Sequence, residues 1–283
     1  MKSVLECCVD SVESAVAAKA GGADRIELCS GLVIGGLSPS KALFQKIRET
    51  VNIPIRTLLR TRFGDFCYTE YEHEILKEEV RMFRQLGADG VVIGSLTPDG
   101  NLNMNQMKEL MEEAGEMKVT LHRAFDMCKN PLETLEQAKE LGIDTILTSG
   151  QKNCAAEGTE LLKQLVEKSE NKIEILVGGG VDGNVIESLY RETNATSYHM
   201  SGKLSLESEM QYRNPDVNMG LASMSEYEIW RTSEERVRKA RRVLDSLYKA
   251  GKFVMNFLIF CHILLTAATT AIVVSESVTA TAE

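Results

Sequence analysis

The sequence predicts an α/β protein built as a single (β/α)8 barrel, the TIM-barrel fold, with an apolar helical tail at its C-terminus. At four places, beginning near residues 20, 85, 140 and 192, a helical run ends in a turn containing Gly or Asn and a short apolar run follows. Such residues are typical of a helix C-terminus. Apolar runs and helical patterns alternate throughout, and eight such units in about 200 residues favour a barrel. An open dinucleotide-binding sheet would need a GxGxxG turn, and the first turn reads VDSVES instead.

The individual elements follow from the same alternation. Four further apolar runs, at 4–9, 53–60, 118–123 and 173–179, join the four that follow the turns and bring the number of expected strands to eight. Helical patterns fill the intervals between strands, at roughly 11–20, 39–50, 72–86, 103–115, 131–141, 158–169 and 184–193. Each strand is therefore expected to be parallel to the next, with a helix returning the chain between them.

Composition narrows the class of protein. The chain has 283 residues, of which 43% are hydrophobic and 26% charged, as expected of a soluble globular protein with a large core. A formal net charge of -9 argues against a general nucleic-acid binder, because neutralising phosphates needs a basic surface. The seven cysteines form no CxxC pair and no secretory signal precedes the first strand. These features predict reduced thiols and a cytoplasmic location.

Polar residues are concentrated at the ends of the predicted strands, as in KVTLHRAFDM at 118–127. Side chains alternate between the two faces of a strand, and the apolar face must contact the helices, so the polar face is expected to point into the barrel. Active sites of this fold lie at the C-terminal ends of the strands. The expected mouth is lined by Glu6, Cys8, Glu27, Cys29, Arg60, His122 and His199. The alternative is a buried Glu and Arg network with a purely structural role.

The loops that follow the strands contribute further candidates. RTRFGDF at 60–66 and HRAFD at 122–126 carry charged side chains, and glycine-rich turns at 177–181 and 200–203 lie where TIM barrels often bind phosphate. The glycines could equally form a tight turn without a ligand. The predicted ligand-binding residues are Arg25, Arg60, Arg62, Asp65, Arg123, Gly178, Gly179, Gly180, His199 and Ser201.

Two functions compete on chemical grounds. Cys8 and Cys29 share the inward parity of neighbouring strands, which run about 4.8 Å apart, so both are expected metal ligands, and their thiolates suit a soft ion. Buried cysteines are also common as small apolar residues. The alternative is an enzyme that acts on a small anionic or phosphorylated substrate held by Arg60 and Arg62. Its expected catalytic residues are Glu6, Glu27, His122 and Asp126.

Several segments resemble the CutC family of copper homeostasis proteins. They are LECCVDSVESAVAAKAGGADRIELCS, GGLSPS, RTRFGDF, GADGVVIGSL, LHRAFDM, LTSG, GGGV and YRNPDVNMG, in this order between Val4 and about Lys249. The resemblance implies a TIM barrel over residues 1–250, cytoplasmic residence, a tendency to form homo-oligomers and a role in copper homeostasis. With copper implied, Cu(I) becomes the metal expected at Cys8 and Cys29, because it prefers thiolate ligands.

Residues 251–283 are expected to form a separate tail. The stretch FVMNFLIFCHILLTAATTAIVV, 253–274, carries no charge and is long enough to cross a bilayer as a helix. A basic stretch before it would remain on the cytoplasmic side. The tail is therefore predicted to contact a membrane, the alternative being a segment appended by a mistaken gene model.

Overall fold

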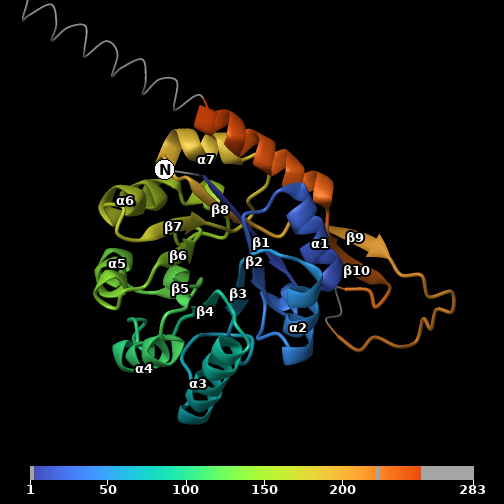
Figure 1. The fold of residues 1–283 in the computed structure, drawn as a ribbon, viewed down its shortest axis with the longest axis horizontal. Helices are drawn as coiled ribbons and strands as arrows, with labels where there is room; N and C mark the ends of the chain where they lie inside the picture. The colour runs from blue at the N-terminus through green and yellow to red at the C-terminus, as the bar shows by residue number, and fades with distance from the viewer. Residues whose placement is uncertain (1–2, 221–223, 250–283) are drawn as a thin grey trace, which may run out of the picture. The chain divides into compact units, whose positions relative to one another are not determined.

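Eight parallel strands close into a barrel in sequence order, which confirms the predicted TIM-barrel fold (Figure 1). The computed structural model describes residues 3–220 and 224–249. The strands are β1 (Val4–Val9), β2 (Arg25–Leu28), β3 (Ile55–Leu58), β4 (Gly90–Ile93), β5 (Lys118–Leu121), β6 (Thr145–Thr148), β7 (Glu174–Val177) and β8 (Ser197–Met200). Hydrogen bonding between β1 and β8 closes the ring.

Seven helices return the chain between successive strands, at the places that the sequence predicts. They are α1 (Val12–Gly21), α2 (Lys41–Thr50), α3 (Glu70–Gln85), α4 (Met104–Ala114), α5 (Pro131–Glu140), α6 (Thr159–Ser169) and α7 (Ile186–Thr193), and one more helix begins at residue 234. Local signals fix their ends. Thr69 and Glu72 form a capping box at the start of α3, and Gly22, with φ of 95°, ends α1 in the left-handed region.

A polar layer fills the lower half of the barrel, at the N-terminal ends of the strands. Arg25 donates to Glu174 Oε2 at 3.0 Å and also pairs with Glu6, which is fully buried. Arg56 donates to the hydroxyls of Thr120 at 2.7 Å and Thr145 at 2.8 Å. Apart from the pair between Arg25 and Glu6, these bonds join strands that are not neighbours, so the side chains must cross the barrel interior. The position is one where TIM barrels usually place Val, Ile and Leu.

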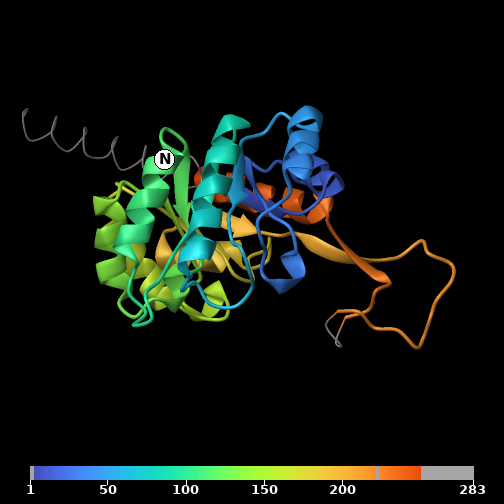
Figure 2. The same cartoon turned by 90° about the horizontal axis from the view of Figure 1, so that it is seen from below.

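An antiparallel ribbon follows the barrel and was not predicted. Strands β9 (Lys203–Glu207) and β10 (Glu228–Thr232) pair with each other, and the described residues between them, 208–220 and 224–227, extend away from the barrel (Figure 2). At its base, Thr232 N donates to Ser14 Oγ in α1 at 3.1 Å, and Lys203 Nζ lies 3.2 Å from the centre of the Trp230 ring. The ribbon is therefore attached to the barrel beside the end of β8.

The predicted apolar tail, 253–274, lies outside the described residues. Within 3–220 and 224–249, no helix combines the length and the apolar character needed to cross a membrane. The membrane contact of the tail and the domain division at residue 250 stay predictions.

The polar layer predicts that Arg25 is essential for stability. Arg25→Ala should lower the free energy of unfolding by about 3 kcal/mol or more, because it leaves the buried Glu6 carboxylate without its guanidinium partner. Arg191→Ala, which breaks the exposed pair with Glu187 on α7, is the control and should cost less than about 1 kcal/mol. Urea unfolding followed by circular dichroism measures both. Similar losses in the two variants would show that the layer contributes little.

Candidate functional site

A cavity of about 120 Å³ lies at the C-terminal ends of the barrel strands. Its lining comes from six strands or the loops after them, and comprises Cys8, Glu27, Cys29, Leu32, Gly35, Gly36, Leu58, Arg60, Phe66, His122, Arg123, Leu147 and His199. Larger hollows of about 770 Å³ on the outside of α3 and about 580 Å³ around the strand starts contain none of the predicted site residues. Of these three hollows, the smallest is therefore the one that predicted site residues line.

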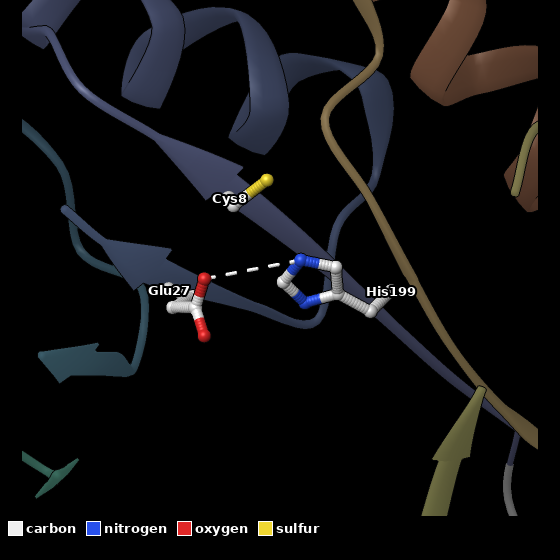
Figure 3. A group of neighbouring side chains, drawn as sticks. All are labelled: Cys8, Glu27 and His199. Carbon is white, nitrogen blue, oxygen red and sulfur yellow. Dashed lines mark ion pairs between the residues drawn. The ribbon is translucent and has the colours of Figure 1, made fainter. Parts of the chain in front are cut away.

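One wall of the cavity brings together a thiol, a carboxylate and an imidazole. One ligand atom each from Cys8, Glu27 and His199 lies within 4.8 Å of the other two (Figure 3). Strand register explains the meeting, because Cys8 of β1 lies opposite Glu27 of β2, while Glu6 of β1 lies opposite His199 of β8. His199 Nε2 is 3.8 Å from Glu27 Oε2. We call these three residues the thiol–imidazole group.

Glu6 fixes the orientation of the His199 ring. Its Oε1 lies 2.8 Å from His199 Nδ1, which leaves Nε2 directed toward Glu27 and Cys8. Burial would raise the pKa of Glu6, but Arg25 and His199 outweigh it and hold that pKa well below its usual range. The carboxylate is thus charged and accepts the Nδ1 proton of His199. A histidine held in this way at one nitrogen presents the other as a ligand.

Burial and neighbouring charges shift the pKa values in the thiol–imidazole group in opposite directions. Burial would lower the pKa of His199, but the neighbouring Cys8, Glu27 and Glu6 raise it well above its usual value. Burial also raises the pKa of Glu27 to about 7, against the attraction of the charged imidazole. The group can therefore take up or release protons near neutral pH, as expected of a functional site.

Another part of the cavity lining carries two cations and a neutral histidine. The Phe66 ring packs between His122, at 4.6 Å between ring centres, and the guanidinium of Arg60, at 4.9 Å. His122 Nδ1 accepts a hydrogen bond from the backbone N–H of Ala124 at 3.1 Å. Burial, helped by Arg60, lowers the pKa of His122 to about 3, so the ring is neutral. Arg123 completes this part of the lining and pairs with Asp126 at 2.7 Å.

Other predicted site residues lie away from the cavity lining. Arg25 belongs to the polar layer below, and Asp126 accepts from Thr148 Oγ1 at 2.5 Å and from Ser149, which ties two loops together. Arg62 pairs with Asp65 at 2.9 Å within its own loop. The lining also omits Glu6, Gly178, Gly179, Gly180 and Ser201.

Gly178 nevertheless has a role beside the cavity. A Cβ atom there would lie 3.4 Å from His199 Cβ and only 2.6 Å from Leu147 Cδ1, so a larger residue would crowd the imidazole. The glycine at 178 thus makes room for His199.

Cys29 lines the cavity but lies outside the thiol–imidazole group. Its side chain packs with Leu58 and Val92, and its Sγ is 3.6 Å from the carbonyl oxygen of Val9. Burial raises the pKa of this thiol well above its usual value. The alternation of side chains along the strands predicts Cys8 and Cys29 as a metal-binding pair and gives Glu27 and His199 other roles. The strand register, which sequence parity does not supply, is what places these two residues beside Cys8.

The fold and the cavity define a TIM-barrel protein with a thiol, an imidazole and a carboxylate at the mouth of the barrel. A model of the CutC family matches residues 3–204. The chain is 40% identical over 245 residues to the copper homeostasis protein cutC homolog of Homo sapiens, covering 86% of this chain and 90% of that protein. It is 43% identical over 241 residues to a family protein CutC of Bacteroides fragilis, covering 84% and 96%. The chain belongs to the CutC family.

Solved structures agree with this assignment. The structure of a CutC protein from Streptococcus agalactiae superposes with a TM-score of 0.66 at 28% identity, covering 70% of this chain and 98% of the other. A thiamine phosphate pyrophosphorylase from Pyrococcus furiosus, with a TM-score of 0.52 and 17% identity, covers 86% and 96% and shares the fold alone.

The neutral state of His122 predicts a pH effect on stability. Its pKa is about 3 in the folded protein and about 6.5 when unfolded. The unfolded chain therefore binds the extra proton, and this contribution to stability is present above pH 6.5 and is lost as pH falls toward 3. His122→Asn removes the titration. The stability difference between wild type and variant should shrink by about 2 kcal/mol from pH 7 to pH 5 in urea unfolding. Parallel pH profiles would contradict a neutral, buried His122.

Proposed function

We propose that this protein takes part in copper homeostasis by binding one Cu(I) ion at the thiol–imidazole group. The observation that carries the proposal is the convergence of Cys8, His199 and Glu27 within 4.8 Å at the mouth of the barrel. Membership of the CutC family, whose relatives are named for copper homeostasis, supports copper as the metal. The expected cytoplasmic location would suit a reduced thiol and Cu(I).

The donor set suits Cu(I). Thiolate and imidazole are ligands that Cu(I) accepts readily, whereas a carboxylate is a harder donor. Cys8 Sγ and His199 Nε2 would hold the ion, and Glu27 would supply a weaker third contact. The cysteine must lose its proton and His199 must be neutral to act as ligands, so a bound metal would replace protons in the cavity.

Glu6 acts as a positioning residue in this proposal. Its bond to His199 Nδ1 holds the ring with Nε2 toward Cys8, and Arg25 keeps the carboxylate charged from below. Carboxylate partners of this kind usually change metal affinity by 10- to 100-fold.

Variants of the two cysteines test the copper site. The wild-type protein should bind about one Cu(I) per chain in competition with a chromophoric chelator, and Cys8→Ser should weaken binding at least tenfold because the thiolate is the softest ligand. His199→Asn should cause a comparable loss, since the amide can still bond to Glu6 but offers no imidazole nitrogen.

Cys29→Ser is the matched control, because it removes a buried thiol from the same cavity outside the group. It should leave the affinity for Cu(I) within about threefold of wild type. That is less than a tenfold change, which would correspond to about 1.4 kcal/mol. An equal loss in Cys8→Ser and Cys29→Ser would replace the proposed ligand set by the two-cysteine site that the sequence predicted.

Catalysis on a small anionic substrate is the second candidate function. It is favoured by Glu27, whose pKa of about 7 suits a general base. Arg60 and His122 line the same cavity. Under this function, turnover would be lost in Glu27→Gln and retained in Cys8→Ser. The opposite pattern in a screen of small oxyacids would exclude this role of Glu27.

The protein is also proposed to form a homo-oligomer, as the resemblance to the CutC family implies.

A further inference from the structure

Arg60 is a buried cation without an acidic partner among the described residues. It is 8% exposed, and none of the ion pairs found within 3–220 and 224–249 includes it. Its Nη1 donates to the carbonyl oxygens of Ile34 at 3.4 Å and Gly36 at 3.3 Å, and its Nη2 donates to that of Gly64 at 2.6 Å. Nε has no partner in the described part of the chain. Carbonyl dipoles and the Phe66 ring therefore surround a charge that nothing neutralises.

His122, which lines the same cavity, carries a second buried donor without a partner among the described residues. Its Nδ1 accepts from the N–H of Ala124 at 3.1 Å, so the proton of the neutral ring must sit on Nε2. The side chain is 3% exposed, and Nε2 has no partner among the residues described. A buried donor left without an acceptor costs about 1 to 3 kcal/mol. An oxygen atom of a ligand that accepted a hydrogen bond from Nε2–H would remove this cost.

The cavity sets the size of that ligand. Its volume of about 120 Å³ corresponds to roughly four water molecules. Arg60, Phe66 and His122 belong to one wall, and the apolar side chains of Leu58 and Leu147 also line the space. The site suits one negative charge shared by oxygens, attached to a very small carbon skeleton.

We propose that Arg60 and His122 form a subsite for a small monocarboxylate, of the size of acetate or glycolate. One carboxylate oxygen would accept from His122 Nε2–H, and the negative charge would neutralise Arg60. We call this pair the carboxylate subsite. The inference rests on the second candidate function, since it names the class of ligand that such an enzyme would hold, but it requires no turnover and no metal.

A carboxylate fits these donors better than a phosphate dianion does. The uncompensated charge on this wall is the single cation of Arg60, because Arg123 is already paired with Asp126. Glu27 lines the same small cavity, so a second negative charge would add to the repulsion between like charges in a buried site.

Ligand titration of the metal-free full-length chain tests the subsite. Acetate, glycolate and inorganic phosphate are each added while the ring protons of the four histidines are followed by NMR, with His122 assigned from the spectrum of His122→Asn. The expected result is a saturable shift of His122 with acetate or glycolate, at lower concentration than with phosphate. Calorimetry should show at least tenfold weaker binding in His122→Asn and in Arg60→Lys, because each loses a donor. Arg191→Lys, an exposed position on α7 outside the cavity, is the matched control and should bind the carboxylate as wild type does.

Four outcomes would overturn the inference. They are no saturable shift of His122, tighter binding of phosphate than of the carboxylates, unchanged affinity in the folded His122→Asn and Arg60→Lys proteins, or loss of binding in Arg191→Lys. Far-UV circular dichroism establishes folding, and if one variant fails to fold, the wild-type shift and the other variant still decide. Carboxylate binding without turnover of any oxyacid would leave the subsite standing while the second candidate function fails.

Discussion

The buried carboxylate of Glu6 is the interaction on which the rest of the barrel interior depends. It is fully buried, it pairs with Arg25 below, and it holds the His199 ring above. A carboxylate in this position is tolerated only because both partners are themselves anchored, Arg25 by Glu174 and His199 by the strand register of β8. The polar layer that stabilises the barrel and the group at its mouth are thus parts of one electrostatic network.

This connection explains why the mouth has unusual proton affinities. Glu6 and Glu27 both act on His199, and the imidazole cannot satisfy the two carboxylates equally, since it lies 2.8 Å from Glu6 and 3.8 Å from Glu27. Glu6 is the better paired of the two and remains charged. Glu27 lies farther from the charged imidazole, and burial raises its pKa to about 7. The two carboxylates therefore separate into a supporting group and a group that can change its protonation state.

Much of this arrangement could be predicted from the sequence, because it follows from alternation. The period of two along β1 and β2 places Glu6, Cys8 and Glu27 inside the barrel, and the helical patterns with their glycine ends predict the (β/α)8 order. The alternation does not show how far along the barrel axis each inward side chain lies. Arg25 shares the inward parity of Glu27, yet it lies in the lower layer and pairs with Glu174.

Contacts between distant segments were also beyond the sequence. Cys29 has the parity of a ligand, but Leu58 and Val92 enclose its side chain, while His199 reaches Cys8 from the other end of the barrel. Asp126, expected to be catalytic, is occupied by Thr148 and Ser149. The β9–β10 ribbon was missed because its strands pair with each other outside the repeating βα pattern.

The central claim is that Glu6 directs His199 toward Cys8 so that a thiolate and an imidazole bind one metal ion together. X-ray absorption spectroscopy at the copper edge, on the protein loaded with one equivalent of Cu(I), tests it most directly because it identifies the atoms bound to the metal. One sulfur and at least one imidazole nitrogen are expected in the first coordination shell of the copper ion. A shell of two sulfurs without an imidazole would contradict it.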